Sequence, residues 1–339
     1  MSEAFCFRFG EFHTRVVFTD ADLAASWKGP SCLPVFDRQV YRLHARGADP
    51  AVVLPAGETA KSWRSARSIL AKALAMGLGR DGRIVGVGGG VVCDLAAFAA
   101  SLYMRGCRLV LAPTTLLAMV DAALGGKTGI NLDRAKNLVG TFYPAEELRV
   151  AIPVLATLPE RELKCGLAEA IKTALLGDAE LLALLRDRRA EVERANPAVL
   201  EEIVFRSLAV KGRIVENDFR EDGARAVLNL GHTFAHALES ASGFRRFRHG
   251  EAVAWGLAKA LALGVRLGVT SRALARDVTE LLELYGFQLE PGVPRDLLLP
   301  AMRADKKRRE GRLRLVLLRE VGAPEVRPVE AERVAEVLK

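Results

Sequence analysis

The sequence contains few cysteines, few aromatic residues and no long apolar segment. Its five cysteines are irregularly spaced and include no Cys-x-x-Cys pair, which indicates reduced thiols in a cytoplasmic protein. No apolar run approaches the roughly 20 residues needed to cross a bilayer. The start, Met1-Ser-Glu-Ala-Phe-Cys6, has neither the basic nor the apolar part of a signal peptide. These absences predict a cytoplasmic protein with no membrane partner.

Signatures of nucleic-acid binding are also missing, although the net charge is +8. Basic residues cluster at Arg245–Arg248 and at Lys306–Arg309, but no helix-turn-helix, zinc-finger or RNA-recognition pattern accompanies them. Aromatic residues do not interleave the second cluster. We therefore expect no nucleic-acid partner. The excess charge fits a solvated surface together with a pocket for a small anionic substrate.

The order of expected elements divides the 339 residues into two domains. Short β-rich runs alternate with helical ones at first, as in a parallel sheet with helices on its faces. The expected strands are 16–18, 33–36, 51–54, 83–87 and 108–112, and the expected helices are 61–76 and 94–102. Later segments have a 3.6-residue apolar period, at 160–176, 179–195, 197–216, 228–240, 251–267 and 272–285. We predict an α/β plus α fold, with a Rossmann-like parallel-sheet domain over 1–152 and a mostly helical domain over 153–339.

Histidine is scarce as well, yet three of the five histidines fall within residues 229–251. His232 and His236 are four residues apart in a segment of helical character, so both rings project from one face. His249 follows a loop signal at Ser240–Gly243 that can return it to the same place. Imidazoles gathered in this way suit a divalent metal such as zinc. Two histidines do not make a site, however, and ordinary capping or core histidines are an equal interpretation without a third ligand.

Glu169 is the best candidate for that third ligand. It lies in the otherwise apolar helical run Gly166-Leu-Ala-Glu-Ala-Ile-Lys172, where an unpaired buried carboxylate would be costly. Lys172, three residues later, shares its face of the helix. The alternative is an exposed surface ion pair between the two side chains.

Two glycine-rich stretches bear different degrees of likeness to phosphate-binding loops. Residues 86–94 follow an expected strand and precede a helix, where backbone N–H groups favour anions. Val91 occupies the third glycine position of G-x-G-x-x-G, so a tight structural turn is an equal alternative. Gly125-Gly-Lys-Thr128 is not a Walker A loop, because Asp121 stands where that motif needs glycine. Lys127 and Asp121 remain active-site candidates in their own right.

Taken together, these stretches resemble the 3-dehydroquinate synthase family over most of the chain, from about Val52 to Ala323. Many landmarks occur in one order, which makes the resemblance specific. They are Pro55–Lys61, Gly88–Asp94, Tyr103–Gly106, Pro113–Ala118, Gly125–Asn131, Lys136–Asn137, Gly166–Lys172, Asn229–His236, His249–Glu251 and Asp305–Lys307.

The resemblance implies a reaction that depends on NAD and on a divalent metal, zinc or cobalt. It would convert 3-deoxy-D-arabino-heptulosonate 7-phosphate to 3-dehydroquinate and phosphate by transient oxidation, β-elimination, reduction, ring opening and aldol closure. The first domain would bind NAD, and the second would bind metal and substrate. Glu169, His232 and His249 are implied as metal ligands, so His236, which helical spacing alone would choose, contacts substrate instead. Arg105 is implied to reach the phosphate from a neighbouring subunit, which predicts a homodimer.

The other site residues follow from the same resemblance. Lys172 and Lys211 would hold hydroxyl groups and developing alkoxide charge, and Arg225 would hold the substrate carboxylate. The remaining expected catalytic and phosphate contacts are Asp121, Lys127, Asn137, Asn229, His236 and Lys306, with Lys307 as an alternative to Lys306. The expected NAD contacts are Asp37, Gly57, Glu58, Lys61, Gly90, Asp94, Thr114, Thr115, Lys127, Lys136 and Thr157. A ribose contact by Asp37 or Glu58 would favour NAD over NADP.

Three positions depart from the family pattern, because Cys93, Ala97 and Ala235 stand where the family usually has glycine. Cys93 either crowds the cofactor phosphates or fits the loop without effect. None of the three departures removes a catalytic group.

Two related activities remain as alternatives. One is a cyclase of the same superfamily acting on sedoheptulose 7-phosphate, and the other is a metal-dependent alcohol or glycerol dehydrogenase. A glycerol-type substrate does not need the anion-binding residues Lys127, Lys211 and Arg225. The complete residue set also argues against a non-catalytic binding protein.

Overall fold

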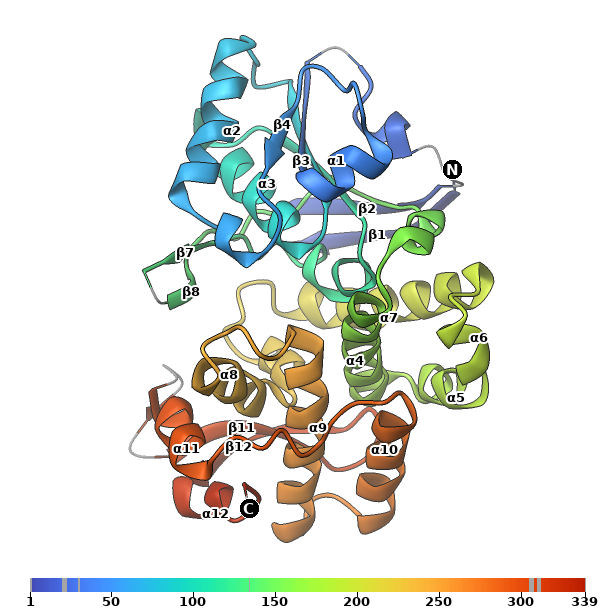
Figure 1. Cartoon of the computed structure of the whole chain (residues 1–339), viewed down its shortest axis with the longest axis vertical. Helices are drawn as coiled ribbons and strands as arrows, with labels where there is room; N and C mark the ends of the chain where they lie inside the picture. The colour runs from blue at the N-terminus through green and yellow to red at the C-terminus, as the bar shows by residue number, and fades with distance from the viewer. Residues whose placement is uncertain are drawn as a thin grey trace. The chain divides into compact units, whose positions relative to one another are not determined.

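The computed structural model in Figure 1 describes residues 2–19, 23–29, 31–133, 135–304, 308–309 and 312–338. The chain forms two compact units, one of residues 1–163 and 200–220 and the other of residues 164–199 and 221–339. The sequence predicts a single boundary after residue 152. In the structure the first unit instead consists of two segments, because residues 200–220 pack with residues 1–163. Among the described residues, no helix is long and apolar enough to cross a membrane.

The first unit is built on a seven-stranded sheet in the order β1-β2-β9-β6-β5-β3-β4. All neighbouring strands are parallel except for the β1–β2 hairpin. β3, β5 and β6 are almost entirely buried, which is why they appear in the sequence as continuous apolar runs. The strands are β1 (Ser2–Phe9), β2 (Phe12–Phe18), β3 (Cys32–Asp37), β4 (Val52–Leu54), β5 (Arg83–Gly88), β6 (Arg108–Pro113) and β9 (Glu147–Val150).

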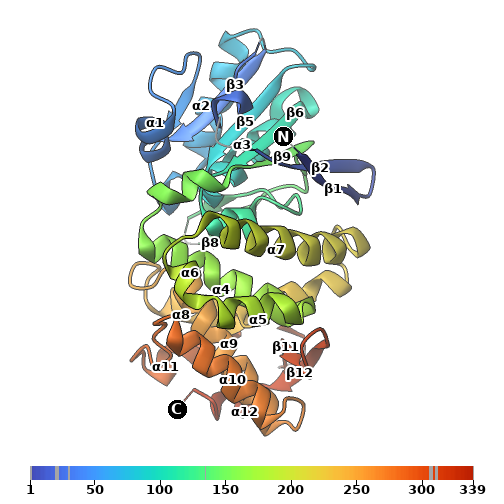
Figure 2. The same cartoon turned by 90° about the vertical axis from the view of Figure 1, so that its right-hand side faces the viewer.

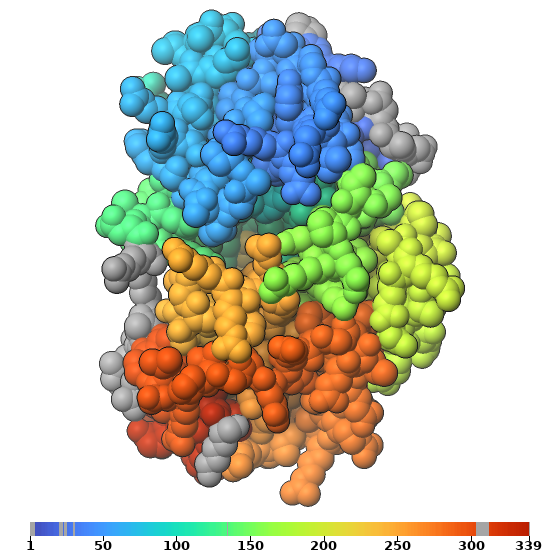
Figure 3. All heavy atoms as spheres, in the orientation of Figure 1, coloured from blue at the N-terminus to red at the C-terminus, as the bar shows by residue number. Residues whose placement is uncertain are grey.

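Helices cover this sheet, as the alternation of the sequence predicts. α3 packs directly on β5 and β6, and α2 packs on α3. In the space-filling view of Figure 3, blue atoms from the first part of the chain cover much of the near face of this unit. A small hairpin, β7 (Ile130–Leu132) and β8 (Ala135–Val139), follows a π-helical turn at Ala118–Ala122. The helices are α1 (Arg38–His44), α2 (Trp63–Ala75), α3 (Gly90–Leu102) and most of α7 (Pro197–Asn217).

Aromatic residues of the β1–β2 hairpin explain why α7 belongs to this unit. Phe5, Phe7 and Phe9 alternate along β1 and therefore project from the same face of the strand. The Phe5 ring lies 4.6 Å from the Phe205 ring. Gly212 lies against Phe7 so closely that an added Cβ would be 2.2 Å from its ring. The hairpin and α7 therefore form one apolar layer, which the helical periodicity of residues 197–216 did not predict.

Glu147, at the start of β9, connects two strands through a buried carboxylate. It accepts hydrogen bonds from Arg15 and from Arg149. Burial alone would raise the pKa of the Glu147 carboxyl, but the two guanidinium groups hold that pKa below its usual value. Its stabilising contribution is therefore present above the unfolded-state pKa of about 4.3 and is lost as pH falls through the lower folded-state pKa.

We expect Glu147→Gln to lower the free energy of unfolding by about 2 kcal/mol at pH 7, because charged hydrogen bonds to two guanidinium groups are lost. This deficit should shrink as the pH falls below about 4. Urea unfolding curves at both pH values measure it. Glu193→Gln, which removes an exposed pair with Arg189, is the control and should have little effect. An equal deficit at both pH values would contradict this account.

The second unit is mostly helical, as predicted. α8 packs on α9 and α11, and α9 packs on α10 and on β11. The helices are α4 (Glu160–Gly177), α5 (Ala179–Asp187), α6 (Arg189–Glu193), α8 (His232–Ala241), α9 (His249–Arg266), α10 (Arg272–Leu284), α11 (Arg295–Ala304) and α12 (Ala331–Ala335). The predicted fold class, α/β plus α, is confirmed.

Two predicted helices of this unit have interruptions. The segment 179–195 forms α5 and α6, and the segment 228–240 is broken at Gly231. Gly231 has a φ of +77°, a left-handed conformation that glycine adopts without strain, so α8 begins only at His232. Near the end of the chain a three-stranded antiparallel sheet forms, and Figure 2 shows β11 and β12 side by side. Its strands are β10 (Arg308–Arg309), β11 (Arg312–Leu318) and β12 (Pro324–Glu330).

Candidate functional site

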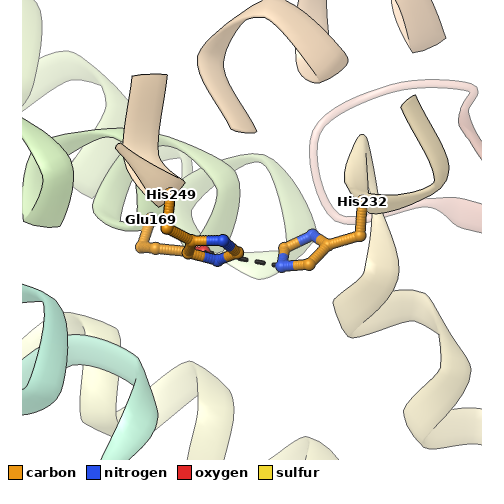
Figure 4. Close-up of side chains that lie close together, drawn as sticks. All are labelled: Glu169, His232 and His249. Atoms are coloured by element: carbon orange, nitrogen blue, oxygen red, sulfur yellow. Dashed lines mark hydrogen bonds and ion pairs between the residues drawn. The ribbon is translucent and has the colours of Figure 1, made fainter. Parts of the chain in front are cut away.

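Three side chains from three helices of the second unit converge on one point (Figure 4). Glu169 lies in α4, His232 is the first residue of α8, and His249 is the first residue of α9. Glu169 Oε1 is 3.1 Å from His249 Nε2 and 3.5 Å from His232 Nε2. One donor atom from each residue lies within 4.8 Å of the others. A carboxylate with two imidazoles is a donor set that zinc and similar divalent metals prefer.

Close backbone contacts hold the three helices at the separation that this convergence needs. An added Cβ on Gly250 would lie 2.3 Å from the Cα of Cys165 in α4. An added Cβ on Gly256 would lie 2.2 Å from the carbonyl oxygen of Gly231. α9 therefore touches α4 and the start of α8 through its glycines. Because Gly250 follows His249 directly, the first of these contacts also sets the position of a candidate ligand.

The protonation states of the cluster suit metal binding at two of its three members. Burial and the nearby Lys172 ammonium lower the pKa of His232, so its imidazole is neutral. His232 Nδ1 lies 3.2 Å from the carbonyl oxygen of Leu230, which accepts a hydrogen bond from Nδ1–H and leaves Nε2 as the ligand atom. Burial would raise the pKa of Glu169, but Lys172 and the two histidines hold it well below its usual value.

His249 differs, because it carries a proton when no metal is bound. Burial opposes its charge, but the carboxylates of Glu169 and Glu239 outweigh this effect and raise the pKa of His249 to about 10. Metal binding at Nε2 must therefore release one proton.

Lys172 completes the cluster from the next turn of α4. Its Nζ lies 2.6 Å from Glu169 Oε2, and both side chains are fully buried. This ion pair occupies Oε2 and leaves Oε1 facing the two imidazoles. Because both side chains are buried, the alternative that Glu169 and Lys172 form an exposed surface ion pair is excluded. Three protein donors around one point, with Lys172 beside them, fit a divalent metal that retains an open position for substrate.

Three further predicted residues of the second unit lie outside the donor cluster. His236 is exposed, and its ring meets the His232 ring edge-on at 5.6 Å. Arg225 is only 2% exposed, although it is a long cation. Asn229 donates through Nδ2 to Glu221 Oε1 at 2.7 Å. Glu221 was not singled out by the sequence analysis, but it has a left-handed φ of +61°, a strain that is common at functional sites. The only sequence feature that could have drawn attention to Glu221 is the turn-forming pair Asp222-Gly223 that follows it.

In the first unit, the glycine loop lies where a dinucleotide is expected. Taken without the hairpin, the strand order β4-β3-β5-β6-β9 places the topological switch between β3 and β5. Ligands of such sheets bind outside the carboxyl ends of the strands at the switch. β3 ends at Asp37 and β5 ends at Gly88, immediately before the N-terminus of the 13-residue helix α3. The N–H groups of that helix end fit the pyrophosphate of NAD.

A polar network joins several of the predicted cofactor residues near this loop. Lys61 Nζ lies 2.5 Å from Asp94 Oδ2 and also donates to Asn137 Oδ1. Asn131 links Glu58 to this network, because it donates to Glu58 Oε1 and accepts from the N–H of Asn137, both at 2.9 Å. The structure thus brings together residues that come from four separate landmarks of the sequence.

The other predicted first-unit residues are more scattered. Thr114 donates its N–H to the carbonyl oxygen of Gly88 at 2.9 Å, and an added Cβ on Gly89 would lie 3.1 Å from the Thr115 side chain. Asp37 Oδ1 caps α1. The remaining predicted cofactor residues are Gly57 at a left-handed turn, Gly90 at the start of α3, exposed Lys127, Lys136 in β8, and Thr157 beside His44.

Lys211 and Asp121 form a separate pair in the first unit. Lys211 Nζ donates to Asp121 Oδ1 at 2.7 Å and to the Asp121 carbonyl oxygen at 2.5 Å. Arg105 is exposed at the end of the 3-10 turn Tyr103–Arg105 that follows α3, and its φ of +64° is a left-handed conformation that is unusual for arginine. Lys306 and Lys307 lie outside the described residues.

The first unit contains a cavity of about 310 Å³, and all the residues that line it are charged. Arg83 and Arg108 begin β5 and β6, so the cavity opens at the amino ends of the strands, away from the glycine loop. Its carboxylates pair with its guanidinium groups, as Glu146 does with Arg108 at 2.8 Å. We interpret it as an ion-pair network and not as the cofactor site.

Cys93, which departs from the family pattern, is accommodated inside the protein. Its side chain is 1% exposed, and Sγ lies 3.7 Å from the carbonyl oxygen of Gly88. Burial and the neighbouring Asp94 raise the pKa of the Cys93 thiol, so it is not a reactive thiolate.

Sequence comparisons match both halves of the chain to one family. Residues 51–165 match the family described as 3-dehydroquinate synthase N-terminal, and residues 166–308 match 3-dehydroquinate synthase C-terminal. The 3-dehydroquinate synthase of Acinetobacter baylyi is 44% identical over 282 residues, which cover 83% of this chain and 78% of that protein. The synthase of Xanthomonas oryzae pv. oryzae is 41% identical over 343 residues, covering 94% of this chain and 92% of that protein.

Solved structures with the same fold include both alternatives considered from the sequence. The 2-epi-5-epi-valiolone synthase ValA of Streptomyces hygroscopicus, with NAD⁺ and Zn²⁺ bound, is 30% identical with a TM-score of 0.85 and 95% coverage of each chain. A 2-deoxy-scyllo-inosose synthase with carbaglucose-6-phosphate, NAD⁺ and Co²⁺ is 25% identical with a TM-score of 0.86 and 98% coverage of each chain. A probable glycerol dehydrogenase of Sinorhizobium meliloti shares the fold at 18% identity and a TM-score of 0.70.

Proposed function

Because the chain belongs to the 3-dehydroquinate synthase family, we propose that it converts 3-deoxy-D-arabino-heptulosonate 7-phosphate to 3-dehydroquinate and inorganic phosphate. The observation that carries this proposal is the cluster of buried Glu169 and His232 with half-buried His249, in a chain about 40–44% identical to curated synthases. The lower identity to the valiolone synthase, 30%, favours the carboxylate-bearing substrate over sedoheptulose 7-phosphate.

The proposed reaction begins and ends with the same form of the cofactor. Transient oxidation of a ring carbinol acidifies the neighbouring C–H, phosphate leaves by β-elimination, and reduction, ring opening and aldol addition follow. When bound, NAD supplies a reversible hydride acceptor and a divalent metal supplies Lewis acidity. Glu169, His232 and His249 would hold that metal. No NADH accumulates in this scheme, which separates it from a dehydrogenase.

The remaining residues bind charge on the substrate. Lys172, held next to Glu169, would stabilise alkoxide charge at the reacting hydroxyl, and Lys211 would hold a second hydroxyl. The buried guanidinium of Arg225 would bind the carboxylate in a bidentate fork. Lys127, Asn137, Asn229 and His236 would bind the phosphate group, as the family resemblance implies.

The free cysteines support a reducing compartment. None of the five forms a disulfide in the structure, and Cys32, Cys93, Cys107 and Cys165 are buried. A disulfide framework is therefore absent from the part of the chain that the structure describes, and we propose that the protein works in the cytoplasm.

We propose further that the enzyme is a homodimer and that Arg105 completes the phosphate site of the neighbouring subunit. Exposed Arg105, held in a left-handed conformation, is suited to reach another chain. Arg105→Ala and Lys172→Ala should each be nearly inactive alone. Mixed after refolding, they should recover about a quarter of wild-type sites, because half of random dimers contain one intact site of two. Recovery is measured as phosphate release. A mixture no more active than its components would contradict a shared site.

The direct test of function is phosphate release by the purified protein with NAD⁺ and 3-deoxy-D-arabino-heptulosonate 7-phosphate. Parallel samples contain a chelator or sedoheptulose 7-phosphate. We expect release with the first substrate only, loss of release on chelation, and no net NADH. Release with only sedoheptulose 7-phosphate would assign the chain to the cyclase branch, and accumulation of NADH would assign it to the dehydrogenases.

A further inference from the structure

We infer that Glu239 is a positioning residue for the metal site, which orients His249 and holds the proton on its Nδ1. The inference rests on the proposed metal role of His249. Glu239 lies in α8, whereas His249 begins α9, so the contact joins the two helices that carry the histidine ligands.

The geometry places His249 between two carboxylates. Its Nε2 lies 3.1 Å from Glu169 Oε1, and its Nδ1 lies 3.6 Å from Glu239 Oε1. One ring nitrogen thus faces the donor cluster and the other faces away from it. The distance of 3.6 Å exceeds that of a hydrogen bond, so the contact to Glu239 in this structure is electrostatic.

Burial gives this contact its significance. Glu239 is 5% exposed, and a buried carboxylate is costly unless a cation or donor stabilises it. The His249 ring supplies such a group. When Nε2 is a metal ligand, the imidazole is neutral and its single proton must be on Nδ1, facing Glu239. A carboxylate there selects this tautomer and increases the basicity of the ligand nitrogen.

The three candidate ligands would then each have an orienting contact. Lys172 pairs with Oε2 of Glu169 at 2.6 Å, and the Leu230 carbonyl accepts from Nδ1 of His232 at 3.2 Å. Lys172 is also proposed to contact substrate, and the Leu230 carbonyl is a backbone group that a substitution does not remove. Glu239 is therefore the orienting group whose side chain can be changed without altering a proposed ligand or substrate contact.

The test is metal affinity, measured without substrate. Zn²⁺ or Co²⁺ dissociation constants are determined by chelator competition, and the visible absorption of bound Co²⁺ reports ligand geometry. We expect Glu239→Gln to raise the dissociation constant about 10–100-fold and to alter the Co²⁺ spectrum. Glu239→Asp, which keeps a shorter carboxylate, should be intermediate. At saturating metal, turnover should recover to within a few-fold of wild type.

Glu251→Gln is the matched control. Glu251 lies two residues after His249 and accepts the Arg248 N–H at 2.8 Å, so its loss weakens the start of α9 but spares the Glu239 contact. It should retain wild-type metal affinity. A Glu239→Gln protein with wild-type affinity and spectrum would overturn the inference, as would an equal loss in Glu251→Gln. If Glu239→Gln does not fold, Glu239→Asp decides by the same criteria.

A further variant, Glu169→Gln, distinguishes failure of this inference from failure of the proposed metal site. If Glu169→Gln also leaves metal affinity unchanged, the cluster does not bind the metal, and the proposal for the site itself fails.

Discussion

Replacing Glu169 with glutamine is expected to lower kcat/KM about 1,000-fold, which corresponds to about 4 kcal/mol of transition-state stabilisation. Glu169 contributes the anionic donor of the cluster, and its Oε1 faces both imidazoles at 3.1 and 3.5 Å. A neutral amide is a poor ligand for a divalent metal, so the Lewis acid is lost with it. Turnover at increasing Zn²⁺ or Co²⁺ measures the effect. Glu160→Gln, on the exposed first turn of the same helix, should have wild-type activity.

The same substitution should destabilise the metal-free protein by about 3–5 kcal/mol, because it leaves the buried ammonium of Lys172 without its carboxylate. Adding Lys172→Met removes the uncompensated charge. The double variant should therefore recover most of the stability and none of the activity. Urea unfolding in the presence of a chelator gives the stability of each variant. A Glu169→Gln protein with wild-type turnover, or a double variant that regains it, would contradict the assignment.

Replacing Gly250 with alanine is expected to have the second largest effect. The added Cβ would lie 2.3 Å from the Cα of Cys165, and neither backbone can move aside as a flexible side chain would. Overpacking of this kind costs about 1–3 kcal/mol or more. Because His249 is the preceding residue, α9 must shift at a candidate ligand, and a displacement near 1 Å can cost about 100-fold in rate. Metal affinity and turnover should both fall.

Gly264→Ala separates misplacement of the ligand from simple destabilisation. Gly264 lies in the same helix, and an added Cβ would lie 2.0 Å from Thr270 Oγ1. It is four turns away from His249, so it should lower the melting temperature but leave metal affinity unchanged. Equal losses of metal affinity in the two variants would show that general unfolding is responsible.

The 3.6-residue apolar period predicted α4 and α9 well, because apolar residues at this spacing form the buried face of a helix. The segments 160–176 and 251–267 correspond closely to α4 and α9. The break at Gly231 was not predicted, because a glycine after an asparagine and a leucine fits either a cap or a helix interior. The β1 strand was also missed, since its alternating phenylalanines pack on α7 and this partner lies about 200 residues later in the chain.

The candidate site could be predicted only in part from spacing. His232 and His236 are four residues apart, so helical geometry favours them as a pair. The structure instead gathers His249 with Glu169 and His232, because the turn after α8 returns the chain and α9 begins there. The family resemblance supplied this choice, which local sequence rules do not contain. Glu239 gave no signal, since its partner on α9 becomes a neighbour only after folding.

The return of residues 200–220 to the first unit has a consequence for synthesis on the ribosome. The first unit cannot complete its apolar layer at residue 163, because α7 covers Phe7 only after residue 220 has been made. At about 5–20 residues per second, those 57 residues take roughly 3–11 s. During this interval the aromatic face of the hairpin has no α7 partner. The nascent chain should therefore bind holding chaperones most strongly between these two lengths, and release them once α7 has emerged.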